Sequence, residues 1–354
     1  MTVPTTRLFE PLQIGAVKLT HRIVMGPLCS NTADENNVLT PPAVKYFSER
    51  AQYPGTLIIG EATFVSPRAS GTSEPRAGIW TDAQIAGWRD VVSAVHAQGS
   101  FIFLQLWALG RCADPEIKKR EGTGDVISSS AVPAKEDGVV PRPLTTEEIW
   151  SYVKDYAVAA RTAVKACGFD GVELHGGNAS LIDQFTQDCV NRRNDGWGGS
   201  VENRSRFALE ITKAVCEAVG ADRIGFRISP WSTYQGMGME RNATIEQFSH
   251  LLRGLKASGI AYIHLVESRI AGRVDVEAGD SLDAFTESWG EAGPFMIAGG
   301  YDPTTARAAL DKQYRGKDVA IAFGRAFVTN PDLVARVRGG RELVENKSWT
   351  ATAG

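Results

Sequence analysis

The sequence predicts an α/β fold, a single (β/α)8 TIM barrel that spans residues 1–354 as one domain. Short apolar runs alternate eight times with longer amphipathic stretches, which is the pattern of parallel strands that are each followed by a helix. No change in composition between these units marks a linker. A doubly wound open sheet is the alternative, but no GxGxxG motif follows the first apolar run, which counts against a dinucleotide-binding fold.

The apolar runs are the predicted core strands, and they occupy residues 23–27, 56–62, 101–106, 171–174, 224–228, 261–266, 295–298 and 319–323. Helices are expected at residues 42–52, 82–98, 145–166, 204–218, 244–258 and 303–313, with a last helix after Asn330. Good start signals support several of these helices, such as Thr145 before two glutamates and Asp302 before a proline.

Three segments lie outside this repeat. Residues 8–18, within an N-terminal cap of residues 1–20, are expected to form a small hairpin that closes the bottom of the barrel. The long polar stretch 110–143 follows the third strand and is interpreted as an inserted loop over the active face. Its basic triplet Lys118-Lys119-Arg120 is interpreted as a solvated surface. The polar tail 345–354 is expected to be poorly ordered.

Composition argues against several classes of function. The formal net charge is −3 and no basic stripe occurs, so a nucleic-acid partner is not expected. No apolar run reaches the roughly 18 residues of a membrane span, and the N-terminus lacks the order of a secretory signal. The five cysteines are scattered and odd in number, which predicts no disulfide framework, no metal site and a reducing, cytoplasmic compartment. We expect a monomer or homodimer that acts on a small molecule.

The ends of the predicted strands carry the residues from which a barrel builds its active site. Glycines end the seventh and eighth strands and precede a helix start, which is typical of a phosphate site. Arg325 and Arg227 would add cations there. Gln105 can both donate and accept hydrogen bonds, which suits the edge of a flat heterocycle with amide and carbonyl groups. The set favours a flavin mononucleotide over a sugar phosphate, for which Gln105, Trp107 and His175 would be surplus.

Long motifs then identify a family. In order along the chain they are LFEPLQIGAVKLTHRIVMGPL, GEATFVSP, FLQLWALGR, GVELHGGNASLIDQF, NDGWGGSVENRSRF, RISPW, IAGGYDP and AFGRAFVTNPDLV. With these motifs the sequence resembles the Old Yellow Enzyme family of FMN-dependent ene-reductases over nearly its whole length. It looks most like fungal members from secondary metabolism.

The resemblance implies a set of residues that bind FMN, with NADPH or NADH as the reductant. Cys29 stands where many members carry threonine, and a thiol is a weaker donor to the flavin carbonyl. The implied FMN-binding residues are Pro27, Leu28, Cys29, Ala62, Gln105, Arg227, Gly299, Gly300, Gly324 and Arg325.

The resemblance also implies the substrate site. His175 and Asn178 correspond to the pair that hydrogen-bonds the carbonyl oxygen of an α,β-unsaturated aldehyde or ketone, so that hydride from flavin N5 adds to the β carbon. Trp107 is implied to line the substrate pocket.

One departure from the family pattern leaves the net reaction open. Where members carry the tyrosine that protonates the α carbon, this chain has Ser180, which is too short and too weakly acidic for that role. Solvent or another side chain could protonate in a reductase; alternatively the enzyme is an isomerase or a desaturase without net NADPH use. A shorter residue also enlarges the pocket for a bulky substrate. A non-catalytic protein that retains FMN is a further alternative, against which the intact His175 and Asn178 argue.

Overall fold

Eight parallel strands form a closed barrel in this computed structural model, which describes residues 6–272, 274–277 and 279–345. The ring closes because β4 pairs with both β3 and β6. The (β/α)8 prediction is therefore confirmed. In ring order the strands are β3 (Ile23–Met25), β4 (Leu57–Ile59), β6 (Phe101–Trp107), β9 (Gly171–His175), β10 (Ile224–Ile228), β11 (Tyr262–Val266), β14 (Phe295–Ala298) and β15 (Val319–Phe323).

Most strand positions agree with the prediction, and three of them agree in both bounds. The first two predicted strands were too long at their C-terminal ends. Pro27 has no N–H for a ladder hydrogen bond, and β3 ends two residues before it. The short strand β5 (Thr63–Phe64) is set apart from β4 and pairs beside the end of β6.

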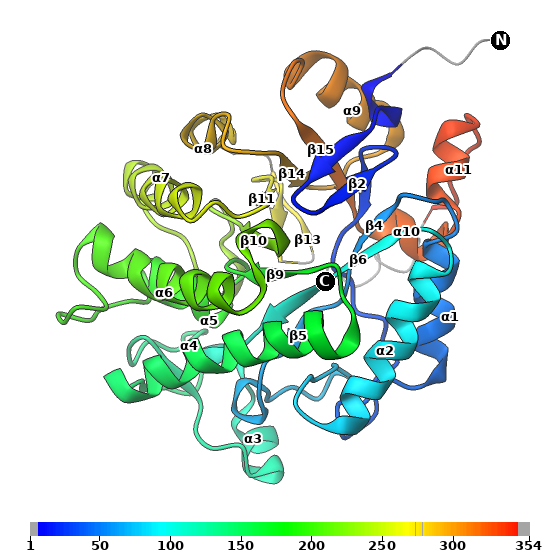
Figure 1. Ribbon diagram of the computed structural model, residues 1–354. Helices are drawn as coiled ribbons and strands as arrows, with labels where there is room; N and C mark the ends of the chain where they lie inside the picture. Colours follow the sequence, from blue (N-terminus) through cyan, green and yellow to red (C-terminus); the bar gives the residue numbers. More distant parts are fainter. Residues whose placement is uncertain (1–5, 273, 278, 346–354) are drawn as a thin grey trace.

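Helices surround the strands, as Figure 1 shows. Side chains of Thr81, Thr145, Ser200 and Asp302 cap the N-termini of four of them. No helix among the described residues is long and apolar enough to cross a membrane. The expected outer helices are α1 (Pro41–Arg50), α2 (Asp82–His96), α4 (Thr146–Arg161), α6 (Val201–Val219), α7 (Arg241–Ala257), α9 (Pro303–Ala308) and α11 (Leu333–Arg338).

Four short helices were not predicted, including the one that follows the sixth barrel strand. Elements of five to seven residues are too short for the helical period to be legible in sequence. They are α3 (Pro115–Glu121), α5 (Leu181–Thr186), α8 (Asp283–Trp289) and α10 (Arg325–Thr329).

The expected N-terminal hairpin closes the bottom of the barrel. Its strands β1 (Leu12–Ile14) and β2 (Val17–Leu19) are antiparallel and bury their alternate apolar residues against the lower barrel interior. Gly15 makes the turn with φ +51°, and a Cβ there would lie 1.8 Å from the carbonyl oxygen of Asp222. The hairpin therefore sits directly against the chain at the start of β10.

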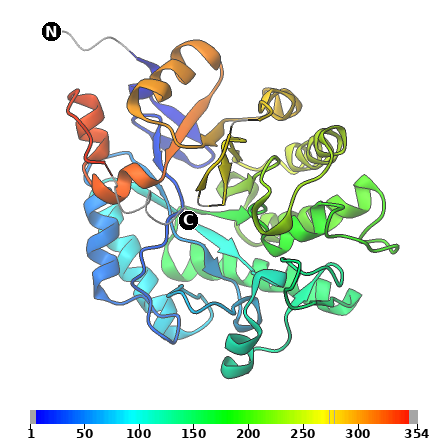
Figure 2. The same cartoon turned by 180° about the vertical axis from the view of Figure 1, so that it is seen from behind.

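The insertion after β6 is more ordered than the sequence suggests. It contains α3 and the parallel pair β7 (Ile127–Ser128) and β8 (Arg142–Pro143), and it includes the teal helix at the lower edge of Figure 2. Lys118 is a correction: this side chain is 2% exposed, and its Nζ donates to the carbonyl oxygen of Arg68 at 3.0 Å. Of the tail 345–354, only Glu345 lies within the described residues.

Candidate functional site

A cavity of about 1450 Å³ opens at the C-terminal ends of the barrel strands. All of the residues that the sequence assigns to the cofactor or the substrate pocket line this cavity. Ser180, the third residue of the predicted catalytic set, does not line it. None of residues 110–143 lines it either. The insertion instead packs beside the site, where Ser128 and Ser129 hydrogen-bond with Gln184 of α5.

His175 and Asn178 enter the cavity from the end of β9, and both leave polar atoms unpaired. His175 Nδ1, Asn178 Oδ1 and Trp107 Nε1 are buried without a hydrogen-bond partner among the described residues. Burial, together with the nearby Arg227 and His264, lowers the pKa of His175 well below its ordinary value. The imidazole is therefore neutral and carries one N–H, which suits a hydrogen bond to a ligand oxygen.

The two glycines between His175 and Asn178 allow the backbone to approach β10 closely. A Cβ on Gly176 would lie 2.3 Å from the ring of Phe226, and one on Gly177 would lie 2.7 Å from Ser229 Oγ. The N–H of Asn178, which has φ +49°, donates to the same Ser229 Oγ at 2.7 Å. Packing against β10 thus fixes where the two polar side chains point.

Ser180 faces away from the cavity and serves the fold. Its hydroxyl donates to the carbonyl oxygen of His175 at 2.6 Å, and the side chain is 1% exposed. The hydroxyl oxygen of Ser180 also accepts a hydrogen bond from the N–H of Asp183 and thereby caps α5. The residue at the position where the family resemblance implies the tyrosine donor is therefore the N-cap of α5 in this chain.

Below the cavity floor, Glu173 is the centre of a polar network that the sequence did not predict. Gln105 Nε2 donates to Glu173 Oε1 at 2.7 Å, and Oε2 accepts from Tyr262 (3.0 Å) and from His264 Nδ1 (2.9 Å). Burial alone would raise the pKa of Glu173, but His264, Arg227 and the hydrogen bond from Gln105 hold it below its ordinary value. A charged residue inside an apolar run, Val172-Glu173-Leu174, was the available sequence signal.

This network also orients two of the expected cofactor residues. Because its amide nitrogen is used by Glu173, Gln105 retains its carbonyl oxygen as an acceptor. Arg227 lies beside Glu173, and its Nε is buried without a partner among the described residues. One acceptor and one donor cation therefore remain for a ligand on this wall.

The opposite end of the cavity is glycine-rich and cationic. Gly299 has φ +152° and Gly300 has φ +66°, and a Cβ on Gly299 would lie 2.4 Å from Cβ of Glu267. Arg325 makes two short hydrogen bonds, of 2.6 and 2.5 Å, to Asp275 on the hairpin of β12 (Ile270–Ala271) and β13 (Val274–Asp275). An anion at Arg325 would have to share the guanidinium with this carboxylate or replace it.

The start of the β3–α1 loop forms another wall, made of Pro27, Leu28 and Cys29, with Ala62 nearby in the lining. Leu28 Cδ2 would lie 3.6 Å from a Cβ on Gly324, so these two segments meet closely. The thiol of Cys29 donates to the carbonyl oxygen of Pro75 at 3.3 Å. Its hydrogen is thus already engaged, in contrast to the expected donation to a cofactor.

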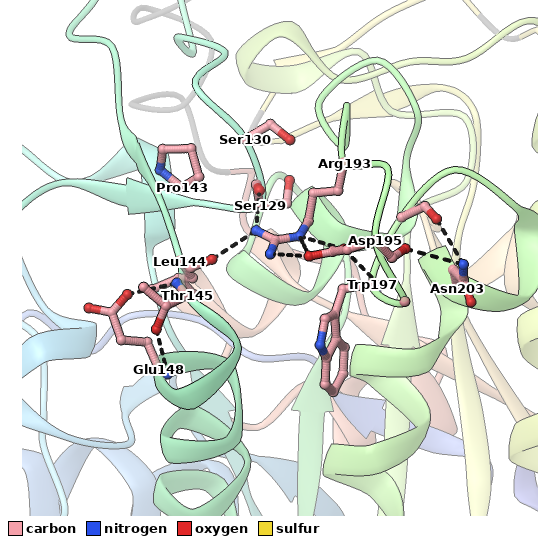
Figure 3. A network of polar contacts seen from close by, with 12 residues as sticks. Ser129, Ser130, Pro143, Leu144, Thr145, Glu148, Arg193, Asp195, Trp197 and Asn203 are labelled. Carbon is pink, nitrogen blue, oxygen red and sulfur yellow. Dashed lines mark hydrogen bonds and ion pairs between the residues drawn. The ribbon is translucent and has the colours of Figure 1, made fainter.

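Arg193, on the long loop after α5, joins this loop to the insertion after β6 (Figure 3). Its guanidinium donates to the carbonyl oxygens of Ser129 (3.0 Å) and Leu144 (2.8 Å) and pairs with Asp195. A second, smaller cavity lies here, but the half-buried guanidinium of Arg193 that lines it already has hydrogen-bond partners. We therefore interpret this region as the support that joins the insertion and α6 to the active face.

Sequence reasoning missed several residues that line the main cavity. Tyr234 follows β10 and Tyr301 follows β14, and the segment 341–345 returns to the rim. Asn330 holds that segment through Val344, whose N–H donates to Asn330 Oδ1 at 2.8 Å. No family motif marked Tyr234, because it lies three residues beyond RISPW in an irregular loop.

Comparisons with a protein-family model, with individual proteins and with solved structures all point to the same family. Residues 7–344 match the model of the NADH:flavin oxidoreductase / NADH oxidase family. The chain is 51% identical to a chanoclavine-I aldehyde reductase of Penicillium roqueforti over 339 residues, which cover 96% of this chain and 91% of the relative. It is 46% identical to a probable inactive reductase of Epichloe festucae var. lolii over 344 residues, 96% of this chain and 90% of the relative. The Old Yellow Enzyme of Pichia sp. AKU4542 superposes with a TM-score of 0.89 at 35% identity, covering 97% and 90% of the two chains.

Proposed function

The chain belongs to the NADH:flavin oxidoreductase / NADH oxidase family, in its Old Yellow Enzyme branch, and from that premise we propose that it reduces the C=C bond of an enal or enone. It is an NAD(P)H-dependent flavin oxidoreductase. The proposed substrate is a bulky fungal secondary metabolite. The observation that carries the proposal is a group of buried polar atoms in cavity-lining residues that have no hydrogen-bond partner among the described residues: His175 Nδ1, Asn178 Oδ1, Trp107 Nε1 and Arg227 Nε.

The residues present fit FMN as the cofactor. Gln105 offers an amide oxygen to a ring N–H, and Arg227 offers a cation to a ring carbonyl or an electron-rich ring edge. Gly299, Gly300 and Arg325 offer a close backbone approach and a guanidinium for a phosphate. The fit requires the Asp275 carboxylate to yield part of Arg325.

The substrate carbonyl is proposed to lie against His175 and Asn178. A neutral imidazole N–H and a carboxamide N–H together donate to the carbonyl oxygen and stabilise the negative charge that grows on it. Bound FMN supplies hydride, obtained from NADPH or NADH, for the β carbon of the substrate. The role of this chain's residues is to hold the carbonyl, exclude water and provide the proton for the α carbon.

A bulky substrate is supported by the size of the cavity and by the absence of a tyrosine at position 180. The cavity of about 1450 Å³ must hold both FMN and substrate. Ser180 contributes no side chain to it. A relative with 51% identity is named for its action on chanoclavine-I aldehyde, and an aldehyde conjugated to a double bond is the class of substrate we propose here.

Ser180 also favours a second candidate function. Because its hydroxyl is bonded to the carbonyl oxygen of His175, an enolate would not meet the usual proton donor. The enolate could then return its hydride to the flavin and leave an isomerised double bond. Alternatively, the enzyme could act as a desaturase, with hydride passing from the substrate to the flavin. Neither reaction uses NADPH in net terms. A relative from Epichloe is named as a probable inactive reductase, but for this chain a non-catalytic FMN-binding role is disfavoured by His175 and Asn178, which both line the cavity.

The test is an anaerobic visible spectrum of the purified protein. NADPH is added first and 2-cyclohexenone second. A flavin band that bleaches and then returns supports the reductase. A band that bleaches but does not return with any enone favours the second candidate, which is then checked by looking for substrate isomerisation without NADPH consumption. No flavin band after incubation with FMN contradicts the proposal.

A further inference from the structure

If Ser180 does not deliver the proton in a reductase, either solvent or another group at the cavity must do so. The lining residues with hydroxyl groups are Ser30, Tyr46, Tyr234, Tyr301, Thr304 and Thr329. Three of these hydroxyls already have acceptors within the protein. Ser30 binds Glu61 at 3.1 Å, Tyr301 donates to Glu267 at 2.7 Å, and Thr329 donates to the carbonyl oxygen of Val344 at 2.7 Å.

Acidity and position decide among the three remaining hydroxyl groups, those of Thr304, Tyr46 and Tyr234. Thr304 is an aliphatic alcohol, too weak an acid for this step. Tyr46 lies on α1 beneath the guanidinium of Arg50, which in turn binds the carbonyl oxygens of Phe327 and Val328 beyond β15. That places Tyr46 across the barrel from the end of β9. Tyr234 is on the loop after β10, the strand next to β9.

Tyr234 is close in structure to the substrate-binding pair. The loop that carries it is joined to Asn178 through the 2.7 Å hydrogen bond from the Asn178 N–H to Ser229 Oγ. The tyrosine packs against the small apolar cluster that contains Ala179 and Met237. Ala179 directly follows Asn178 in the chain, and Tyr234 and Asn178 line the same cavity.

The ring of Tyr234 is held in place, while its hydroxyl is left without a partner among the described residues. A Cβ on Gly272, which has φ +61°, would lie 2.3 Å from Cδ2 of the ring. On the other side, Arg111 donates to the carbonyl oxygen of Gln235 at 2.7 Å. A half-buried phenol with a fixed ring and a free O–H at a cavity wall is suited to donate to a ligand.

We propose that Tyr234 is the proton donor to the α carbon of the substrate; this inference rests on the proposed function. Hydride adds to the β carbon, and the electron pair of the C=C bond moves onto the enolate that His175 and Asn178 hold. The O–H bond of Tyr234 then breaks as a C–H bond forms at the α carbon. The phenolate that remains takes a proton from water and restores the enzyme.

The experiment compares Tyr234→Phe with the control variant Tyr53→Phe in anaerobic stopped-flow measurements. In Tyr234→Phe, bleaching by NADPH should stay within about twofold of wild type, while reoxidation by 2-cyclohexenone should slow by about 10²-fold or more. In Tyr53→Phe, reoxidation should stay within about twofold of wild type, since its phenol lies outside the cavity, where it accepts a hydrogen bond from Arg338. Titration with 4-chlorophenol, followed by the change in flavin absorbance, should show that both variants still bind ligand.

Labelling in D2O gives a second readout, which a merely structural role would not change. Wild type should place deuterium on one face of the α carbon, and Tyr234→Phe should lose that facial preference. If the wild type is reoxidised normally and Tyr234→Phe is reoxidised equally fast, or if Tyr53→Phe shows the same large loss as Tyr234→Phe, the donor role alone is overturned. A wild-type protein that no enone reoxidises overturns the proposed function, and the donor role with it.

Discussion

Glu173 and His175 are two residues apart on β9 and are both buried, yet they differ in whether their polar atoms have hydrogen-bond partners. Both oxygens of Glu173 accept hydrogen bonds, from Gln105, Tyr262 and His264. His175 Nδ1 has no partner among the described residues, and neither does Asn178 Oδ1 three residues later. Residues two apart on a strand face the same way, so one side of β9 carries a satisfied network and an unsatisfied site in succession.

The difference distinguishes scaffold from ligand site. An unpaired buried polar group costs about 1–3 kcal/mol of stability. Where several such groups line one cavity, as His175, Asn178 and Trp107 do, a ligand in that cavity would complete them. A fully bonded carboxylate needs no ligand and instead fixes the groups around it. The predictions below test this division, beginning with the largest expected effect.

Removing the centre of the satisfied network should be the most destabilising change. Glu173→Ala leaves Arg227 and His264 in a buried setting without their carboxylate, and we expect the free energy of unfolding to fall by about 3–5 kcal/mol. Urea denaturation measures this. Glu49→Ala, which removes an exposed partner of Lys45, is the control and should cost less than about 1 kcal/mol. Equal effects in the two variants would contradict the scaffold interpretation.

Removing the unsatisfied pair should spare the fold and impair the chemistry. For His175→Ala combined with Asn178→Ala, we expect the rate of flavin reoxidation by 2-cyclohexenone to fall about 10²–10³-fold, because the donors to the growing oxyanion are lost. FMN content and the urea midpoint should stay close to wild type. If 4-chlorophenol binds to this variant as tightly as to wild type, the assignment of the two side chains as carbonyl donors is wrong.

Ser180 should behave as a member of the scaffold. Ser180→Ala loses the cap of α5 and the hydrogen bond to the His175 carbonyl oxygen, which we expect to cost about 1 kcal/mol in urea denaturation. Reoxidation by enone should stay within about threefold of wild type. Ser180→Thr keeps a hydroxyl and is the matched control, with a smaller loss of stability. A large kinetic loss in Ser180→Ala at full stability would return Ser180 to the reacting groups.

Asp183 provides a pH-dependent effect and a contrast with Glu173. No cation pairs directly with this buried carboxyl in the described structure, and burial raises its pKa to about 7 from its ordinary value of 3.8. The folded state therefore binds a proton that the unfolded state releases between these values. Its contribution to stability is fully present below pH 3.8 and is lost as the pH rises through 7. Asp183→Asn should flatten that part of the profile in urea denaturation from pH 4.5 to 8; an unchanged slope would contradict the prediction.

The barrel and the cavity wall could be predicted because they depend on local patterns. Apolar runs at regular intervals place the strands, and the end of each strand is the place where a barrel carries its site residues. Arg227 and Gln105 could therefore be assigned to the cavity from their position alone. Long motifs such as GVELHGGNASLIDQF added their order and identity.

Contacts between distant residues could not be predicted in the same way. Nothing near Lys118 in sequence shows that its amine reaches the carbonyl oxygen of Arg68. The pairing of Arg325 with Asp275 joins residues 50 positions apart. The capping role of Ser180 could have been predicted. A serine followed three residues later by an acidic residue, here Asp183, is a typical start of a helix.

The position of Ser180 has an evolutionary consequence. A change of Ser180 to tyrosine in one step would remove the hydroxyl that caps α5 and binds the His175 carbonyl oxygen, and it would place a phenol where the side chain is 1% exposed. The effect of such a change therefore depends on the residues around it. A lineage that carries this serine would need another cap for α5 and more open space before position 180 could hold a tyrosine, so selection would more readily recruit an acid elsewhere in the cavity.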